Sequence, residues 1–466
     1  TWDVASRPYL VTGDVTVDAS ASLTIEPGVE VRFVPLSDDQ SGGQDANRSE
    51  LRIYGTLSAL GTASENIIFT SNSELPSSGD WYGVYVQGSN SQADLNYTEL
   101  GYGTYGVYFR EVYGSVADTT HISHNYIHHS GTGIYTDWSQ RFHFITNNRI
   151  EDCSGSGISL GYSNRSSEGQ ISSNIIRRVS GTGISLGNHN TYLLSGNVIS
   201  DGGDWGIVLN ELNHVEMYQD SIYNRGNGIS IGNVVSARIN ECIVLNNSYR
   251  GIEISYSNAV IEHSEIMNNR DGIYLQTNFE NPTVDTIRYN TITSNSRYGI
   301  ENRDYARPVV QYNDLHDNSS YDFRNYSTAW SELDARYNWW GQATTDTMDL
   351  GGNPKNIQKI YDFYDNESYG FVNYGGWLDG PGGSPTAITS TGSVTLVNSS
   401  GVEVLNYDVG EDVYVRVEDA DANTAGGSVE ILSVLLSSAT ETGGESLTLT
   451  ETGMNTGVFE GSMGFD

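Results

Sequence analysis

The sequence predicts an all-β protein in which a long stack of short-stranded coils precedes a smaller domain of alternating strands. Three observations support this prediction. A two-part repeat of about 23 residues recurs along most of the chain. Glycine and tyrosine are abundant, with 52 and 31 of the 466 residues, which favours tight turns and strands over helices. A stretch rich in glycine and proline then separates the repeat from a region with a different period.

The first part of the repeat is glycine, then isoleucine or valine, then any residue, then an apolar residue. Its copies begin at Gly83, Gly106, Gly133, Gly157, Gly183, Gly206, Gly228, Gly251, Gly272 and Gly299. Successive residues of a strand point to opposite faces, so the apolar residues point inward and the residues between them outward. One coil cannot bury its inward residues alone. Stacked coils can, because each pairs its strands in parallel with the next.

The second part of the repeat is an apolar residue, two further residues, asparagine, one residue and another apolar residue. It places asparagine at the same turn of successive coils, at Asn125, Asn148, Asn174, Asn197, Asn290 and Asn313. Variant copies carry Asp220 and Ser264 at this position. We expect these side chains to form a ladder inside the stack, bonded to one another and to the neighbouring backbone. The alternative is that asparagine is only a turn former, since it tolerates left-handed backbone angles.

Both ends of the repeat region resemble a known family. The opening stretches Pro8–Val17 and Leu23–Val29, and the closing stretches Tyr337–Gly341, Ile360–Phe363 and Val372–Tyr374, are similar to the first and last coils of right-handed parallel β-helix proteins that bacteria secrete. The resemblance covers residues 1–378 and implies a right-handed parallel β-helix. It specifies the fold and leaves the function open, because this fold hosts many functions.

The repeat length predicts the number of coils in the helix and whether the two cysteines can form a disulfide. At about 23 residues per coil, residues 1–378 predict roughly 14–16 coils. Cys153 and Cys242 then lie about four coils apart, near 19 Å at roughly 4.8 Å per coil. A disulfide needs Cα atoms within about 7 Å. We therefore expect two separate, buried thiols.

Residues 379–387 read as a linker, and the pattern changes after it. Alternating segments at Val394–Val397, Val413–Val417, Val429–Leu436 and Leu447–Leu449 predict a β-sandwich over residues 388–466. The words Asp408–Val415, Asp419–Asn423 and Leu449–Gly461 resemble Ig-like modules of bacterial surface proteins, which usually carry further strands after this point. Either the protein continues beyond Asp466, or a strand from another chain completes the sandwich.

The net charge of the chain limits the classes of partner that it can bind. The net charge is −35, with 23 basic and 58 acidic residues, and a field of that sign repels nucleic acid and anionic membrane surfaces. No apolar run approaches the roughly 18 residues that a membrane span needs, so membrane insertion is not expected. The same field attracts cations, above all Ca²⁺. The chain starts at Thr1 without a signal peptide, and we interpret it as a processed, secreted or cell-surface protein, or as a piece of a longer one.

One acidic loop has the pattern of a calcium site. Glu418–Asn423 places oxygen ligands at alternate positions, which makes Asp419, Asp421 and Asn423 the candidate Ca²⁺ ligands. The loop lacks the glycine and the terminal glutamate of an EF-hand. The alternative is a solvated acidic turn between strands.

The outward side of the glycine-led strand offers the candidate site for a ligand. Its residues are Tyr85, Tyr108, Tyr135, Ser159, Ser185, Val208, Ser230, Glu253, Tyr274 and Glu301. In β-helix enzymes that act on polysaccharides, the resemblance implies that such a face holds the sugar chain. Aromatic rings would stack on sugars and paired carboxylates would transfer protons. The weak catalytic candidates are Arg110, Asp137, Glu211, Glu253 and Arg303.

Catalysis is nevertheless not the leading expectation for this face. The motifs of polygalacturonases are absent, and a site like that of pectate lyase needs clustered acids beside an arginine or lysine base. The sequence shows no acid cluster beside Arg110 or Arg303. A passive, tyrosine-bearing sheet face without catalytic residues is therefore the main interpretation.

These observations lead to two hypotheses of different classes. The leading one is a non-enzymatic extracellular structural protein: a subunit of a filament, surface layer or adhesin that assembles into a homopolymer by strand addition. The alternative is a polysaccharide lyase or glycoside hydrolase acting on the β-helix face. A carbohydrate adhesin without catalysis lies between them, so polysaccharide is the second candidate partner.

Overall fold

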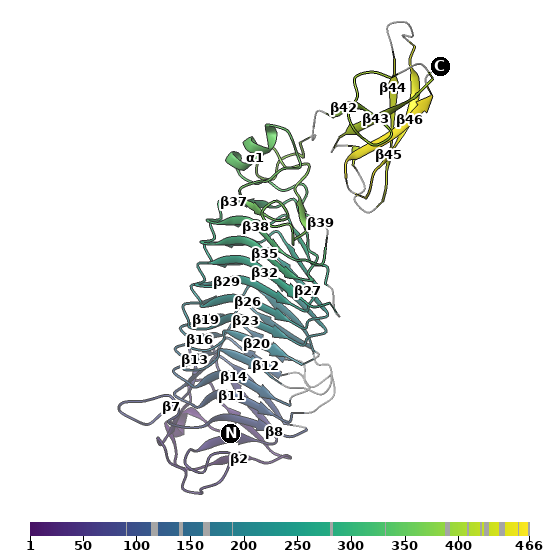
Figure 1. Ribbon diagram of the computed structural model, residues 1–466. Helices are drawn as coiled ribbons and strands as arrows, with labels where there is room; N and C mark the ends of the chain where they lie inside the picture. The colour runs from purple at the N-terminus through teal and green to yellow at the C-terminus, as the bar shows by residue number, and fades with distance from the viewer. Residues whose placement is uncertain are drawn as a thin grey trace.

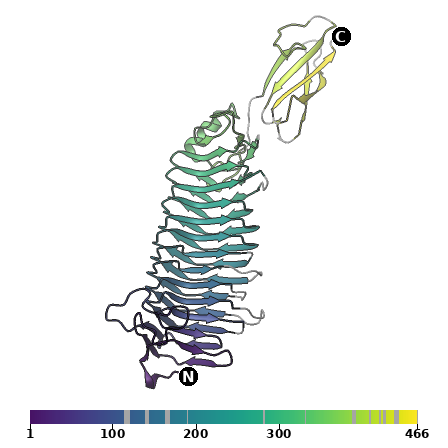
Figure 2. The same cartoon turned by 60° about the horizontal axis from the view of Figure 1, so that its bottom comes forward.

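The computed structural model of the chain describes residues 1–89, 91–112, 120–138, 143–161, 168–188, 190–279, 283–330, 332–386, 392–407, 410–419, 422–423, 428–437, 443–454 and 456–464. The described residues form a long stack of coils, followed by a small separate sheet at the C-terminus (Figure 1). Seen from another side, the strands of each coil lie next to those of the preceding coil along the whole stack (Figure 2). The predicted all-β, parallel β-helical architecture is confirmed.

Each coil contributes one strand to each of three parallel sheets. Sheet 1 contains β1 (Tyr9–Val11), β4 (Glu30–Phe33), β7 (Ile67–Ser71), β10 (Thr98–Gly101), β13 (Tyr126–His128), β16 (Arg149–Glu151), β19 (Ile175–Arg177), β22 (Val198–Ser200), β25 (Ser221–Tyr223), β28 (Ile243–Leu245), β31 (Glu265–Met267), β34 (Thr291–Thr293) and β37 (Asp314–His316).

Sheet 2 contains β2 (Val15–Val17), β5 (Glu50–Ile53), β8 (Gly83–Gln87), β11 (Tyr105–Arg110), β14 (Thr132–Asp137), β17 (Ile158–Leu160), β20 (Ile184–Gly187), β23 (Trp205–Asn210), β26 (Asn227–Gly232), β29 (Arg250–Ser255), β32 (Asp271–Thr277), β35 (Tyr298–Asp304), β38 (Tyr321–Tyr326) and β40 (Ile360–Tyr361). The copies of the first part of the repeat, which begins with glycine, form the strands of sheet 2 from β8 to β35.

Sheet 3 contains β3 (Ser22–Ile25), β6 (Thr56–Leu60), β9 (Gln92–Asn96), β12 (Thr120–Ser123), β15 (His143–Thr146), β18 (Glu168–Ser172), β21 (Thr191–Ser195), β24 (His214–Tyr218), β27 (Ser236–Asn240), β30 (Ala259–Glu262), β33 (Thr286–Arg288), β36 (Val309–Gln311), β39 (Glu332–Asp334) and β41 (Phe371–Asn373).

The coil count is lower than the sequence predicts. The three sheets hold 13, 14 and 14 strands, or about 13 complete turns, where the repeat length predicts 14–16 coils. The difference arises because two connections consume residues without adding coils: the long loop between β4 and β5, and the segment around the helix α1 (Gln342–Asp349). The core lies between the three sheets and repeats in register, with Ile134, Ile158 and Ile184 fully buried on successive strands.

The asparagines of the second part of the repeat lie at the turn between sheet 3 and sheet 1. The backbone N–H and the Nδ2 of Asn148 both donate to Oδ1 of Asn174, each at 3.0 Å, and Asn174 donates in the same way to Asn197. Each Nδ2 also donates to a backbone carbonyl of the preceding coil, as Asn174 does to Ile145 at 2.8 Å. Asn197 ends this run by donating to Oδ1 of Asp220 at 2.8 Å.

The left-handed backbone angle at this turn falls on a different residue from the asparagine. It belongs to the residue just before it, such as His124 (φ 57°), Asn147 (φ 57°) and Ser173 (φ 55°). The asparagine side chain therefore serves the hydrogen-bond ladder, and its neighbour makes the turn. Asn125 starts the first run, while Asn290, Asn313 and Asn338 continue the pattern on later coils.

A second ladder lies at the turn that leaves sheet 1, and the sequence words do not include it. Asn247, Asn269 and Asn295 each donate from the backbone N–H and Nδ2 to Oδ1 of the next member, at 2.9–3.2 Å. Asn318 ends this run by donating to Oδ1 of Asp322 at 3.0 and 2.9 Å. The second ladder and the first run of the first ladder thus run in the same direction, and each finishes on a buried carboxyl group.

Both cysteines are free and buried, as predicted. Cys242 occupies the ladder position between Asp220 and Ser264, where its backbone N–H donates to Oγ of Ser264 at 3.1 Å. Burial raises the pKa of both thiols to about 12. Inside the described ranges, no helix has the length and apolar character needed to cross a bilayer.

The C-terminal end of the stack is covered, and a short segment pairs with the edge of sheet 3 at the N-terminal end. At the N-terminal end, a segment with the 3-10 helix η1 (Val4–Ser6) follows Trp2, whose backbone exchanges hydrogen bonds with Thr24 and Glu26. At the C-terminal end, α1 buries Met348, and Trp377 Nε1 donates to Asp349 Oδ1 at 2.9 Å. Assembly by strand addition at an open helix end therefore finds no support.

The C-terminal strands form one antiparallel sheet in the order β42-β43-β46-β45-β44. Their bounds are Ser393–Val397 (β42), Asp412–Glu418 (β43), Ile431–Leu436 (β44), Glu445–Glu451 (β45) and Val458–Gly464 (β46). A small core of Val415, Val417, Leu447, Leu449 and Phe459 lies on one side of it. The predicted strands are present, whereas a second sheet, as an Ig-like sandwich needs, is not seen among the described residues.

Candidate functional site

The outward residues of sheet 2 form one continuous row in register. From β8 to β35, each of them pairs with its counterpart on the next coil, from Tyr85 through Tyr108 and Tyr135 to Glu253, Tyr274 and Glu301. The row continues to Arg324 and Tyr361. The side chains of this row therefore repeat about every 4.8 Å along the face; some are partly exposed, and others, such as Tyr85 and Glu301, are buried.

The repeated glycine brings a second set of residues to the same face. A Cβ on Gly251 would lie 2.7 Å from the carbonyl oxygen of Gly272 and 2.9 Å from Cγ2 of the core residue Ile266. Gly251 thus faces the interior like Ile252 after it, and strict alternation breaks at this point. The residue before the glycine, Arg250, consequently lies on the outer side, where it contacts Glu253 and Tyr274.

This break in alternation creates a dense group of charged and aromatic residues on β29, β32, β35 and β38. We call it the arginine–tyrosine cluster; its members are Arg250, Glu253, Arg270, Asp271, Tyr274, Arg297, Tyr298, Glu301, Arg303, Arg324 and Tyr326. Five arginines in it face three carboxylates. Because the whole chain has only 23 basic residues, this is a strong local concentration of positive charge.

The carboxylates of the cluster are held by paired arginines. Arg303 donates twice to Oε1 of Glu301, at 3.0 and 2.9 Å, and Arg297 donates to both oxygens of Asp271 at 2.6 Å. Arg250 pairs with Glu253 at 2.6 Å. The side chain of Glu301 is 1% exposed, whereas that of Arg303 is 43% exposed. The acids therefore lie beneath, and the guanidinium groups present their remaining donors to solvent.

Tyrosine rings fill the space between the arginines. The Arg250 guanidinium lies 3.5 Å from the ring centroid of Tyr274, and that of Arg324 lies 3.8 Å from Tyr326. Arg324 also donates to the phenol oxygen of Tyr298. Burial raises the pKa of Tyr274, although Arg250 and Arg303 oppose the shift. The stacking fixes the arginines in place, so less conformational entropy is lost when they bind a ligand.

A shallow pocket of about 290 Å³ adjoins the cluster on its N-terminal side. It is lined by Trp205, Asn227, Tyr249, Arg250, Glu253 and Arg270. Trp205 and Tyr249 supply aromatic surface, and Arg250, Glu253 and Arg270 belong to the cluster itself. The pocket and the cluster together offer rings for stacking, guanidinium forks for anions, and carboxylates for hydroxyl groups.

The structure places the weak catalytic candidates in three locations. Glu253 and Arg303 belong to the arginine–tyrosine cluster. Arg110 and Asp137 are register partners on β11 and β14, several coils away. Burial raises the pKa of Asp137, against the pull of Arg110. Glu211 is exposed, follows β23 and has a left-handed backbone angle (φ 55°). The set therefore does not form one catalytic site.

The sequence predicts no acid cluster beside Arg303, but the structure places one acid in direct contact with it. Glu301, two residues earlier on the same strand, accepts both of its hydrogen bonds, and Asp271 lies on the adjacent strand beside Arg297. The sequence analysis followed only the residues after the repeated glycine. It thus missed Arg250, Asp271 and Tyr298, which precede a glycine in three successive copies; that recurrence is the signal that would have found them.

Only two of the three predicted calcium ligands, Asp419 and Asn423, lie among the described residues. Asp419 follows β43 and Asn423 lies beyond it, while Asp421 is outside the described residues. Within the described part of the chain, no group of three or more His, Cys, Asp or Glu side chains could hold a metal ion. Calcium binding at Asp419, Asp421 and Asn423 stays a prediction.

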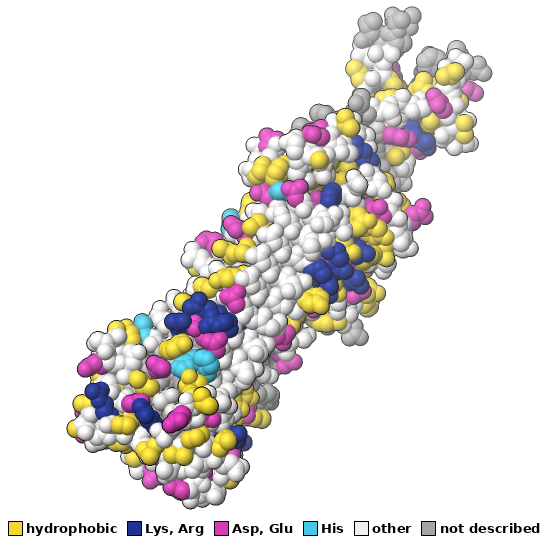
Figure 3. Space-filling view, turned by 90° about the vertical axis from the view of Figure 1, so that its left-hand side faces the viewer, with side chains coloured by type: hydrophobic (Ala, Val, Ile, Leu, Met, Phe, Trp, Pro, Cys, Tyr) yellow, Lys and Arg dark blue, Asp and Glu magenta, His cyan; other side chains and the backbone are white. Residues whose placement is uncertain are grey.

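A second basic group lies on sheet 1. Arg149, Arg177 and Arg178 surround the buried carboxylate of Glu151. Burial would raise the pKa of Glu151, but hydrogen bonds from Arg149 and Arg177 lower it to about 2. Figure 3 shows basic side chains gathered in two dense groups on the face that it presents. This group adjoins neither of the two pockets described here, so it is the weaker candidate.

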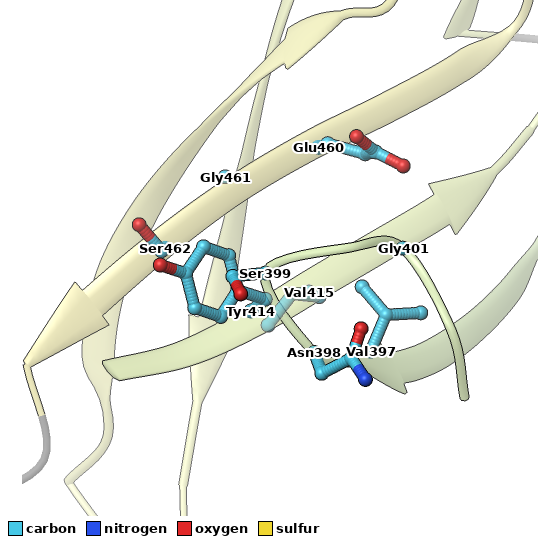
Figure 4. Close-up of a pocket in the computed structure, with 9 residues that line it drawn as sticks. All are labelled: Val397, Asn398, Ser399, Gly401, Tyr414, Val415, Glu460, Gly461 and Ser462. Carbon is cyan, nitrogen blue, oxygen red and sulfur yellow. The ribbon is translucent and has the colours of Figure 1, made fainter. Parts of the chain in front are cut away.

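The small C-terminal sheet carries its own pocket of about 250 Å³. Tyr414 and Val415 of β43, Glu460 and Ser462 of β46, and the turn after β42 line it (Figure 4). Arg416 pairs with Glu460 at 2.6 Å. A single tyrosine and one ion pair give this pocket far fewer binding groups than the cluster on sheet 2.

The fold defines a right-handed parallel β-helix with one long face of aromatic and charged side chains on sheet 2, and comparison with known families agrees on the fold. The description "right handed beta helix region" matches residues 60–222, 142–286 and 205–339, and the chain belongs to this family. The description "pectate-lyase like beta helix domain" matches residues 1–117. The resemblance to right-handed parallel β-helix proteins is thus confirmed, and no curated protein matches the chain.

Several solved structures are similar to the chain at low sequence identity. The A-module of the Azotobacter vinelandii mannuronan C-5 epimerase AlgE6 is 14% identical, with a TM-score of 0.49, over 63% of this chain and 85% of that one. XylC in complex with xylose is 10% identical (TM-score 0.35; 88% and 87% covered). A tailspike protein of E. coli bacteriophage HK620 in complex with a pentasaccharide is 10% identical (TM-score 0.38; 97% and 84% covered).

These findings correct the leading functional expectation. The similar structures include epimerases of polysaccharides and proteins in complex with sugars. The interpretation as a structural subunit is therefore wrong on these findings. The alternative, a protein acting on polysaccharide through the β-helix face, is better supported.

Proposed function

We propose that this protein acts on an acidic polysaccharide, which it binds along the outer face of sheet 2 and cleaves by elimination. The observation that carries the proposal is the arginine–tyrosine cluster. It gathers five arginines and three tyrosine rings on four adjacent strands of a chain whose net charge is −35. Such a concentration of guanidinium forks and stacking surfaces suits uronate rings, which carry a carboxylate on each sugar.

Local charge outweighs the charge of the whole chain at this site. A polyanion approaching from a distance meets a field of net charge −35. At about 0.15 M salt, however, the screening length is roughly 8 Å, so charges beyond the cluster contribute little. Within it, five arginines face three carboxylates. The proposal therefore predicts that affinity rises as salt is increased from very low concentration and falls again at high salt.

The arrangement of the carboxylates favours elimination over hydrolysis. Hydrolysis needs one carboxyl group that donates a proton to the leaving sugar. Glu301 accepts two hydrogen bonds from Arg303, and Asp271 accepts two from Arg297. Elimination instead removes the proton from the carbon beside the uronate carboxylate, breaks the bond from the next carbon to the leaving sugar oxygen, and forms a double bond between the two carbons. Water takes up the removed proton and supplies one to the leaving oxygen, while cations neutralise the uronate carboxylate. Arg303, with its exposed guanidinium, is our candidate for contact with the reacting sugar.

One observation keeps hydrolysis as the second candidate. Glu253 and Glu301 lie two coils apart in the same row, about 10 Å between backbones, close to the roughly 6.5–9.5 Å between carboxyl groups in inverting glycosidases. The two reactions leave different products. Both require the polymer outside the cell membrane, so the proposal includes the predicted secreted or cell-surface location.

The test is to incubate the purified protein with alginate, polygalacturonate and neutral xylan. Binding is measured by affinity electrophoresis and cleavage by ultraviolet absorbance of unsaturated ends and by reducing ends. We expect binding and unsaturated ends with an acidic polymer, and loss of both in Arg303→Ala. The matched control is Arg238→Ala, because Arg238 is also paired with a buried carboxylate, Glu262, but lies on sheet 3.

Each contrary result overturns a defined part of the proposal. Reducing ends without unsaturation would replace elimination by hydrolysis. Binding of xylan alone would overturn the acidic substrate. If Arg303→Ala and Arg238→Ala reduce binding equally, or if the wild-type protein binds none of the polymers, the sheet-2 site itself is wrong.

A further inference from the structure

A second aromatic group lies on the same face of sheet 2, near its N-terminal end. It consists of Tyr82, Tyr85, Tyr105, Tyr108 and Tyr135, and we call it the tyrosine cluster. The ring centroids of Tyr105 and Tyr108 are 4.8 Å apart, and those of Tyr105 and Tyr135 are 5.5 Å apart and stacked. The proposed reaction uses none of these residues.

The rings divide into a buried base and a partly exposed layer. Tyr85 is fully buried and Tyr108 is 8% exposed. Tyr82, Tyr105 and Tyr135 are each half-buried, so part of each ring meets solvent. Burial raises the pKa of Tyr85 to about 12. The cluster is therefore a platform of neutral rings set at different angles, with T-shaped contacts beside the stacked pair of Tyr105 and Tyr135. Its partly exposed rings offer aromatic surface to a sugar ring.

Polar groups border the platform. Arg110 lies next to Asp137 in register, and its guanidinium donates to Oε1 of Gln44 at 3.0 Å. Gln44 belongs to the long loop between β4 and β5. That loop is fixed by Glu50, which accepts from the backbone N–H groups of Gln44 and Asp45 at 2.5 and 3.0 Å. The platform thus has a fixed wall with a donor and an acceptor for sugar hydroxyls.

A strip of short side chains joins the two clusters. Between Tyr135 and Glu253, the outward row consists of Ser159, Ser185, Val208 and Ser230, all partly exposed. The row spans five coil steps, or about 24 Å. None of these side chains is long enough to block a polymer that lies along the sheet.

We infer that the tyrosine cluster is a second sugar-binding site for the same polymer, so that one polysaccharide chain is held at two places about 24 Å apart. This inference rests on the proposed function. Once the arginine–tyrosine cluster holds part of a polymer, the second contact is intramolecular and strengthens binding without a new partner. Affinity should therefore depend on oligomer length, with a steep rise where the oligomer first reaches both clusters.

The experiment measures affinity by calorimetry for size-fractionated alginate and polygalacturonate oligomers, from the dimer to the polymer. The wild-type protein should bind long oligomers roughly 100-fold more tightly than short ones. Tyr105→Ala should remove most of that gain and leave the affinity for short oligomers unchanged. Tyr105→Phe keeps the ring and should behave as wild type. Tyr218→Ala, at a 40% exposed tyrosine on sheet 3, is the matched control.

The two proposals fail in different ways. If Arg303→Ala abolishes binding at every length while Tyr105→Ala matches the wild type at every length, the second site is wrong and the first stands. If the affinity of the wild-type protein does not change with oligomer length, the second site is likewise wrong and the first stands. If no oligomer or polymer binds, or if Arg303→Ala has no effect, the proposed function is wrong and the inference falls with it. Tyr135→Ala repeats the test should Tyr105→Ala fail to fold.

Discussion

The interior ladders and the outer row of sheet 2 are built from the same coil-to-coil register, yet they differ in where their hydrogen-bonding capacity goes. In the ladder, the amide of Asn174 accepts from Asn148 and donates to Asn197 and to the Ile145 carbonyl. On the outer row, Arg303 gives part of its capacity to Glu301 and keeps 43% of its side chain exposed. Stacking in register thus stabilises the fold inside and leaves binding groups available outside.

The largest loss of stability should come from breaking the interior ladder. Asn174→Leu would remove the acceptor of the Asn148 backbone N–H, one of the two acceptors of Asn148 Nδ2, and the Nδ2 donor to the carbonyl of Ile145. Each buried group left unpaired costs about 1–3 kcal/mol, so we expect unfolding free energy to fall by about 3 kcal/mol or more. Chemical denaturation measures the loss. Thr24→Leu, at an exposed residue of β3, is the control, and equal stability of the two variants would refute the role of the ladder.

The next effect should connect the interior with the outer face. Gly251→Ala would place a methyl group 2.7 Å from the Gly272 carbonyl and 2.9 Å from Ile266, and such overpacking costs about 1–3 kcal/mol. Because the same glycine sets the position of Arg250, polysaccharide affinity should fall as well. Gly187→Ala, whose Cβ would meet only the Asn210 carbonyl at 3.6 Å, should change neither. A stable Gly251→Ala variant with full affinity would contradict the close packing.

A pH-dependent effect is expected where the first ladder ends. Burial raises the pKa of Asp220 to about 7, against about 3.9 in the unfolded chain. The folded state then binds the proton more tightly, so the contribution of Asp220 to stability is greatest below about pH 4, declines as the pH rises to about 7, and is constant above. In Asp220→Asn this decline should disappear.

The comparison for Asp220→Asn is the difference from the wild type at each pH. We expect the variant to be more stable by on the order of 4 kcal/mol at pH 8, and the difference to shrink toward pH 4. Taking the difference cancels the contributions of Glu50 and Asp285, whose pKa values burial also raises to about 7. A difference that does not change with pH would show that Asp220 does not titrate in this range.

The smallest effect on stability should come from the outer face. Arg303→Lys keeps the charge but loses the double hydrogen bond to Glu301. Since Arg297 and Arg324 still face Glu301, the unfolding free energy should fall by less than about 1 kcal/mol. Affinity for the acidic polymer should fall about tenfold, because a lysine cannot form the same fork. A large loss of stability with unchanged affinity would place Arg303 on the structural side of the comparison.

Periodicity made the fold and part of the site predictable. Because strand residues alternate, the glycine-led word placed Tyr85, Glu253 and Glu301 on one outward row, and the structure has them there. It could not place Arg250, because the inward-facing glycine breaks the alternation that the prediction assumed. The second ladder, from Asn247 to Asn318, has its own period in the sequence, but its asparagines lie outside the second part of the repeat.

Other features depend on contacts that no local pattern contains. The hydrogen bond between Arg110 and Gln44 joins residues 66 positions apart, and it exists only because an irregular loop folds against sheet 2. The pairing of arginines with Glu301 likewise requires side chains from β35 and β38 to meet. The sequence therefore identified which face to examine, while the chemistry on it emerged from coils brought together in three dimensions.

The strip of short side chains sets the distance between the two clusters, and this distance depends on the number of coils between them. Deleting one complete coil, residues 183–205, would join Thr182 to Gly206 and bring Asn174 opposite Asp220, so that the core and the ladder could close again. Neither cluster would change, but the clusters would lie one coil closer, by about 4.8 Å. The shortest oligomer that benefits from both would then be shorter by about one sugar, and the number of coils would set the length of polymer that the protein recognises.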